Sequence, residues 1–153
     1  MVKILKVSQN YQPMTEDETM NFLAESKALL RLASIRRDGY PDVHVLWFTY
    51  FNDLIYTTTH KKTRKVENLR SNSKVSFTID LDTPPFKGVR GRGVAKLIDD
   101  ENLSKTVLTN EIMKYIGNVE DPLAKHLLAL APDEYVIEIK PLYFATWDAS
   151  KQT

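Results

Sequence analysis

Hydrophobic spacing changes several times along the chain, and the first change marks a helix. Thr15 followed by Glu18 forms a capping box, in which each side chain bonds to the backbone near the other. A helix is therefore predicted to begin there and to run to about Lys27. Its apolar side is supplied by three residues: Met20, Phe22 and Leu23.

From residue 28 the spacing is typical of strands. ALLRLASIRR (28–37) alternates loosely, and Asp38-Gly39 marks a tight turn into PDVHVLWFTYF (41–51), which is rich in β-branched and aromatic residues. Asn52-Asp53 then turns the chain into LIYTTT (54–59). These three segments predict a three-stranded meander.

A short helix is predicted over about 63–71, with Val66 and Leu69 facing inward, before KVSFTID (74–80) returns to strand spacing. Paired prolines make 80–88 a loop, because proline cannot sit in a central strand. The segment that follows, FKGVRGRGVAKLID (86–99), reads as a long strand with glycines along one face. Small residues inside a strand indicate a bend or a close backbone approach.

Two further helices precede the last strand. DDENLSKTVLTNEIMKYIG (99–117) is amphipathic and closes on a glycine, and DPLAKHLLALAP (121–132) carries proline at its first helical position. The last strand is YVIEIKPLYFATW (135–147). About six strands and four helices, with strands mostly joined by short turns, favour a mainly β fold: an antiparallel β-barrel with peripheral helices. No linker or repeat divides the chain, so residues 1–153 are expected to form one domain.

Composition narrows the classes of function. The net charge is +1, from 21 basic and 20 acidic residues, which argues against general binding of nucleic acid. The absence of cysteine excludes disulfides, thiolate chemistry and cysteine-ligated metals. No apolar run approaches the roughly 18 residues that cross a bilayer. A cytoplasmic protein with neither nucleic acid nor membrane as partner is expected.

Positive charge is concentrated in YTTTHKKTRKVENLRSNSKV (56–75), which holds six Lys or Arg against one Glu. Thr63 is a good N-cap, and Arg64 and Lys65 occupy the first helical turn. Cations are unfavourable there, because the helix N-terminus is already partly positive. A bound phosphate would resolve this conflict. The alternative, a merely solvated basic face, remains open, and it is the expected state of the other basic residues: Lys61, Lys62, Arg70 and Lys74.

Other polar residues do not form a recognisable reactive set. The three histidines, His44, His60 and His126, are not at ligand spacing, so no metal is expected. No Ser/His/Asp or Cys/His arrangement is visible, and no catalytic residue is assigned.

Taken in order, these segments resemble a known family. The stretch 29–80, followed by PPFKGVRGRGVAKLI (84–98) and a closing PLYFATW (141–147), is similar to the FMN-binding split-barrel family, which includes pyridoxamine 5′-phosphate oxidase. The similarity covers roughly residues 20 to 98, and the ordered set is more specific than any single piece.

The resemblance implies a six-stranded antiparallel split β-barrel that binds FMN at the interface of a homodimer. By this resemblance, Thr63, Arg64 and Lys65 hold the FMN phosphate, and Thr58 contacts the phosphate or the ribityl chain. The strand along the isoalloxazine ring, which binds largely through its backbone, is formed by His44, Val45, Leu46 and Trp47. Ser34 and Arg36 reach the ribityl or pyrimidine end.

The resemblance further implies an oxidoreductase, with hydride transfer at the flavin N5 atom while the protein positions the ring. Two alternatives stay open: a deazaflavin-dependent reductase of the same fold, or a flavin-binding module without turnover. The first needs a basic groove for its acidic tail, which Lys61, Lys62, Arg90 and Arg92 are candidates to supply. The aromatic run 47–51 is a plausible core for the dimer interface.

Overall fold

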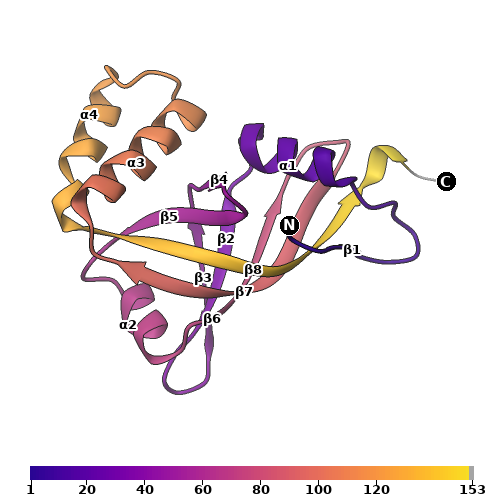
Figure 1. Cartoon of the computed structure of the whole chain (residues 1–153), viewed down its shortest axis with the longest axis horizontal. Helices are drawn as coiled ribbons and strands as arrows, with labels where there is room; N and C mark the ends of the chain where they lie inside the picture. Colours follow the sequence, from indigo (N-terminus) through magenta and orange to yellow (C-terminus); the bar gives the residue numbers. More distant parts are fainter. Residues whose placement is uncertain (152–153) are drawn as a thin grey trace.

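A computed structural model describes residues 1–151 as a curled sheet with helices at its ends and sides (Figure 1). The strands are β1 (Ile4–Lys6), β2 (Leu30–Ile35), β3 (Pro41–Leu46), β4 (Thr49–Phe51), β5 (Leu54–His60), β6 (Lys74–Asp80), β7 (Lys87–Ile98) and β8 (Glu134–Asp148). The helices are α1 (Glu16–Glu25), α2 (Arg64–Ser71), α3 (Glu101–Tyr115) and α4 (Pro122–Ala129). The predicted mainly β fold with peripheral helices is confirmed.

The sheet order is β3-β2-β6-β7-β8-β5-β4, with antiparallel pairs throughout this path. Its two edge strands, β3 and β4, are neighbours along the chain and are joined only by Trp47 and Phe48. The two edges must therefore come together, and the sheet curls into a barrel. Figure 1 shows this curl, with β5 and β8 crossing over β2, β3 and β6.

The prediction of one strand over residues 41–51 within a meander is wrong. β3 pairs with β2, whereas β4 pairs with β5 at the other end of the sheet order. The break follows from burial: Phe48, Thr49 and Tyr50 are buried in succession, so the alternation of a half-buried strand is lost there.

Eight strands are observed where six were predicted. One of the additional strands comes from the break after β3, and the other is β1, which runs parallel to β8 with Ile4 opposite Phe144. A three-residue strand is too short to show an alternating pattern, so the sequence gives no signal for β1.

Several predicted turns and caps are confirmed. The Thr15 hydroxyl accepts from the Glu18 N–H, and the Glu18 carboxylate accepts from the Thr15 N–H. Asn52 and Asp53 have φ of 53° and 61°, the conformation of a tight hairpin turn between β4 and β5. Gly117, with φ of 83°, closes α3.

The core lies inside the curled sheet and includes Val75, Phe77 and Ile79, as predicted for β6. The glycines of β7 serve close packing. A Cβ atom on Gly91 would collide with the Tyr143 carbonyl oxygen, and one on Gly93 would lie 2.7 Å from the Lys140 carbonyl oxygen. The β7–β8 register also shifts beside Gly93, which agrees with the bend expected from the sequence.

Helices α3 and α4 lie together beyond one end of β5 and β8, whereas α2 lies on a different side of the sheet (Figure 1). α3 packs on the sheet through Val107, which joins Tyr56 and Val136 in a second small apolar cluster. Among residues 1–151, no helix combines the length and apolarity that a bilayer crossing requires.

Candidate functional site

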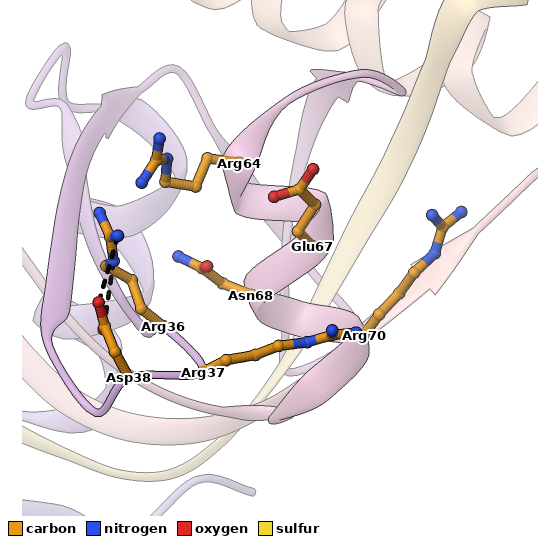
Figure 2. Close-up of a pocket in the computed structure, with 7 residues that line it drawn as sticks. All are labelled: Arg36, Arg37, Asp38, Arg64, Glu67, Asn68 and Arg70. Atoms are coloured by element: carbon orange, nitrogen blue, oxygen red, sulfur yellow. Dashed lines mark hydrogen bonds and ion pairs between the residues drawn. The ribbon is translucent and has the colours of Figure 1, made fainter.

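A pocket of about 500 Å³ opens between α2 and the turn that joins β2 to β3 (Figure 2). Both the turn and the helix contribute arginines, so the pocket is basic. Its lining residues are Arg36, Arg37, Asp38, Arg64, Glu67, Asn68 and Arg70. In Figure 2, Arg36, Arg64 and Asn68 converge, whereas Arg70 extends away from them.

Arg36 is held at the pocket by the turn itself. Its guanidinium forms an ion pair with Asp38 at 3.3 Å, drawn as dashed lines in Figure 2. The Tyr40 backbone N–H also donates to Asp38, at 3.2 Å. This N–H first, and the Arg36 charge second, lowers the pKa of Asp38. The pair is exposed, so it orients Arg36 more than it stabilises the fold.

The start of α2 differs from the predicted hydroxyl cap. Thr63 is the N-cap residue, but its side chain makes no capping hydrogen bond. Its hydroxyl instead lies 3.1 Å from the hydroxyl of Thr59. Glu67 is the one acidic residue in the first turn of α2, whereas Arg64 and Lys65 place two cations there, so the positive end of the helix is offset only in part.

His44 on β3 lies beside this positive end. Burial, followed by the charge of Lys65 and with a smaller effect of Arg64, lowers the pKa of His44, while Asp42 opposes the shift. Its Nδ1 atom is buried and has no hydrogen-bond partner among the described residues. A buried polar atom without a partner is costly, and an anion at this place would supply one once the ring is protonated.

Lys65 faces a carboxylate as well. Burial lowers the pKa of Lys65, with Glu134 as the opposing influence. In turn, burial raises the pKa of Glu134 to about 7, with Lys65 opposing. The Glu134 Oε2 atom is buried without a partner in the part of the chain that the structure describes. Glu134 therefore compensates the Lys65 charge only in part, and sequence reasoning missed it because a lone Glu at a strand start carries no signal.

Ser34 lies on the inner face of β2 and is almost fully buried. Its hydroxyl accepts a hydrogen bond of 3.0 Å from the Asn68 amide of α2, and the same amide donates to Asp42 at 2.9 Å. Asn68 was not predicted from the sequence, because an Asn inside a helix has no spacing that distinguishes it.

Side chains along β3 alternate between two faces. His44 and Leu46 are half-buried, whereas Val45 is 58% exposed on the opposite face. Among the described strands, β3 pairs only with β2, so backbone groups on its free edge are available to a ligand. This arrangement is compatible with the backbone-mediated ring contact implied by the resemblance.

Trp47 and Thr58 are placed differently from the cluster around His44. The Trp47 ring stacks on Tyr115 of α3 at 4.9 Å, and its carbonyl accepts from the Thr57 hydroxyl at 2.6 Å. Thr58 is half-buried, and strand alternation turns it to the face opposite Thr59. No hydrogen bond within residues 1–151 connects Thr58 to the pocket.

Other basic residues have partners of their own. Lys61 forms an ion pair with Asp99 at 2.9 Å, and Arg70 donates to the Tyr135 hydroxyl at 2.9 Å. Arg70 is exposed, as predicted, and both residues also have surface partners that the sequence did not indicate. Arg90 and Arg92 lie on the exposed face of β7, away from the pocket lining. Within residues 1–151, no three His, Asp or Glu side chains are grouped closely enough to hold a metal.

A second polar cluster lies on α3, next to Trp47 and Phe48. The Lys114 ammonium donates to the carbonyls of Leu23 and Phe48, at 3.0 and 3.4 Å, and lies 3.6 Å from the Phe48 ring centroid. Burial lowers the pKa of Lys114 to about 8 and raises that of Glu111 to about 8. Lys114 thus binds other parts of the chain, although it also lines a pocket of about 260 Å³, and the Glu111 Oε1 atom is buried without a partner among the described residues.

Comparisons with known proteins agree on the fold. General stress protein 26 of Bacillus subtilis (strain 168) is 25% identical over 126 residues, covering 80% of this chain and 81% of that protein. The crystal structure of conserved hypothetical protein Rv2991 from Mycobacterium tuberculosis matches with a TM-score of 0.79 at 25% identity, over 94% of this chain and 90% of the other. A structure named F420 reductase matches with a TM-score of 0.67 at 23% identity, over 84% of this chain and 97% of that one.

A family assignment follows from a longer match. The sequence profile of the family described as "Pyridoxamine 5'-phosphate oxidase" matches residues 15–148, which is nearly the whole chain and extends the similarity seen in the sequence at both ends. The curled antiparallel sheet with peripheral helices is the split barrel expected for that family. The chain belongs to the pyridoxamine 5′-phosphate oxidase-like split-barrel family.

Proposed function

We propose that this protein binds FMN, with the phosphate held between the β2–β3 turn and the start of α2. The observation that carries the proposal is the closeness of Arg64 and Lys65 to His44. The Nδ1 atom of His44 is buried and has no partner among the described residues. Arg36, which is paired with Asp38, adds a third cation from the turn. A phosphate dianion would neutralise these charges and satisfy the free donors.

The rest of the cofactor fits along β3. The free edge of β3 offers backbone groups near Val45, and Ser34 stands on the neighbouring strand. Once bound, the flavin would supply hydride transfer at N5, and the role of this chain is to bind and orient the ring. We assign an FMN-dependent oxidoreductase on this basis, with no side chain named as acid or base.

A homodimer belongs to the same proposal. Val43, Val45 and Leu142 are 65%, 58% and 61% exposed, and the sheet register places Val43 on the same outer face as a groove of about 390 Å³ that Leu142 lines. A second copy covering this face would bury these apolar groups. The aromatic run 47–51 does not serve this purpose, because Phe48 and Tyr50 belong to the core of the chain itself.

Light scattering after size exclusion tests the dimer. Val43→Lys combined with Leu142→Lys should shift the protein to a monomer, since two charges would be buried at the interface. Met113→Lys, at an exposed apolar residue of α3 away from this face, is the control. A monomeric wild-type protein would remove this part of the proposal.

A second candidate is a deazaflavin coenzyme of the F420 type. Four arginines, Arg36, Arg37, Arg64 and Arg70, line one pocket together with Asp38 and Glu67, and they offer several separate points of contact for an acidic tail. This arginine pocket replaces the groove of Lys61, Lys62, Arg90 and Arg92 suggested by the sequence. The protein named F420 reductase has the same fold. The absorbance spectrum of the bound coenzyme separates the two, since oxidised FMN and a deazaflavin absorb differently.

The phosphate site is tested by titrating FMN and following the loss of its fluorescence. Arg64→Ala with Lys65→Ala should weaken binding by about two orders of magnitude, since each charge-assisted contact contributes roughly 1.5–3 kcal/mol. Lys105→Ala with Lys125→Ala removes two exposed lysines from α3 and α4 and is the matched control. Unchanged affinity in the first variant would overturn the phosphate assignment.

Turnover is a separate question from binding. Reduction of the bound cofactor by NADH or NADPH, measured anaerobically from its absorbance, supports the oxidoreductase. A protein that binds FMN tightly and is never reduced would instead be a flavin-binding module. A cytoplasmic location is also proposed, supported by the cysteine-free sequence, and cell fractionation tests it.

A further inference from the structure

One amide joins three elements of the candidate site. Asn68 is only 4% exposed, and its side-chain nitrogen donates to Ser34 on β2 and to Asp42 on β3. Ser34 and Asp42 are direct partners across the β2–β3 pair, so they lie on the same face. The amide therefore contacts both strands at one point of their register.

The chemistry of these contacts fixes the orientation of the amide. An ionised Asp42 carboxylate can only accept hydrogen bonds, so the nitrogen of Asn68, and not its oxygen, must face it. One nitrogen with two hydrogens matches two acceptors. A hydrogen bond to a charged acceptor is also stronger than one between neutral groups.

At the other end of α2, Arg70 bonds to Tyr135 of β8, but few polar contacts fix the start of this helix. Thr63 makes no capping hydrogen bond, and its hydroxyl only meets that of Thr59. Arg64 lies one helical turn before Asn68, on the same side of α2. His44 lies two residues beyond Asp42, on the same face of β3. A shift of Asn68 would therefore move Arg64 relative to His44.

We propose that Asn68 is a positioning residue, whose amide locks α2 to the β2–β3 pair so that Arg64, Lys65 and His44 face one phosphate. The inference rests on the proposed function for its ligand. Asn68 lines the pocket, and the role proposed for it is to hold the cationic groups in place through its contacts with the two strands. Figure 2 shows its amide between Arg36 and Arg64.

The first test compares two asparagines of the same segment. Asn68→Ala should weaken FMN binding by about tenfold or more, although the positive charge of the pocket is unchanged. Asn72→Ala removes the C-cap residue of α2, whose side chain bonds only the Lys74 N–H, and should change the affinity by less than about twofold. Circular dichroism verifies that both variants fold. Asn68→Ala binding as tightly as wild type would overturn the proposal.

The second test uses pH as a signature of this hydrogen bond. Asn68→Asp keeps the shape but places two carboxylates together, so they repel at neutral pH and share a proton when the pH falls. The ratio of the variant dissociation constant to that of wild type should be more than about tenfold at pH 7.5 and approach unity near pH 5. The ratio cancels the titration of groups common to both proteins, including His44, Lys65 and Glu134. A ratio independent of pH would contradict the role of the donor.

A third measurement needs no cofactor. Hydrogen exchange of the α2 amides in the ligand-free protein should become faster in Asn68→Ala and return toward wild type in Asn68→Asp at low pH, while the α3 amides stay unchanged. If wild-type protein binds no FMN, the proposed function fails, and exchange alone decides the role of Asn68. Equal protection of α2 in wild type and Asn68→Ala would then refute it.

Discussion

β3 and the Trp47–Phe48 link that follows it contact two helices, and the polar groups of the two helices behave differently. On the α2 side, Arg64 lines an open pocket and lies with Lys65 near His44, whose buried Nδ1 atom has no partner among the described residues. On the α3 side, Lys114 has two carbonyl partners and an aromatic ring. Similar residue types are therefore bonded within the fold at α3 and left open to the proposed ligand at α2.

The two sides differ in whether their cationic side chains are hydrogen-bonded within the chain, although the Glu111 Oε1 atom of α3 also has no partner among the described residues. Polar groups that are bonded within the chain hold segments together, as Lys114 does for α1, α3 and the link after β3. Groups left with free donors cost stability unless something outside the chain binds them. On this reasoning α3 should dominate the stability of the protein, and α2 its affinity for anions.

The largest stability effect is expected from Lys114→Ala. This change leaves the carbonyls of Leu23 and Phe48 without their donor and opens a cavity beside the Phe48 ring. The free energy of unfolding should fall by about 3 kcal/mol, measured by urea denaturation. Lys105→Ala, which removes an exposed ion pair with Glu101 on the same helix, should cost less than about 0.5 kcal/mol. Equal losses in the two variants would contradict the comparison.

The next effect concerns Glu111 and depends on pH. Its pKa is about 8 in the folded protein, above the ordinary value of 4.5, because burial disfavours the charge. The folded state thus holds its proton more tightly than the unfolded state, and stability falls as the pH rises through that window. Glu111→Gln should be more stable than wild type by about 2 kcal/mol at pH 7.5 and by little near pH 4.5.

Thermal or urea unfolding at several pH values measures this difference. The range should end at pH 7.5, because burial lowers the pKa of Lys114 to about 8 and its charge is lost above that pH. A constant difference between the two proteins from pH 4.5 to 7.5 would show that Glu111 stays ionised in the folded state.

A smaller effect is expected from Tyr115→Phe. The hydroxyl of Tyr115 donates to the Ala28 carbonyl at 2.9 Å, which joins α3 to the segment before β2. Its removal should cost about 1 kcal/mol, while the ring keeps its stack on Trp47. Near-ultraviolet circular dichroism, which reports the Trp47 environment, should therefore be almost unchanged. A large spectral change would mean that the hydroxyl also orients the stack.

Local signals predicted most of the elements and part of the site. The capping box at Thr15, the turn at Asn52 and the glycine after α3 depend on neighbours in sequence, and all three are confirmed. Arg64 and Lys65 were singled out because their charge conflicts with the helix end, a feature visible in the sequence alone. Their closeness to His44 arises from the tertiary structure, so no local sequence pattern predicts it.

What the sequence did not predict depends on pairing across the chain. The strand break at Phe48 exists because β3 and β4 reach opposite edges of the sheet, which neighbouring residues do not encode. Asn68 matters only because a strand pair formed some thirty residues earlier presents Ser34 and Asp42 to it. Thr63 shows the converse: a good capping residue by type makes no cap, because Thr59 meets its hydroxyl instead.

The smallest stability effect is expected where the binding effect is largest. Arg64 and Lys65 place two cations at the positive end of α2, so replacing both by alanine removes a repulsion and substitutes a better helix former. The free energy of unfolding in the absence of ligand should stay within about 0.5 kcal/mol of wild type, or rise slightly. The same variant should lose about two orders of magnitude in FMN affinity, since two charge-assisted contacts are gone. Measured together, the two results separate a ligand site from a structural one: a loss of stability similar to that of Lys114→Ala would mean that these cations support the fold, and the distinction between α2 and α3 would fail.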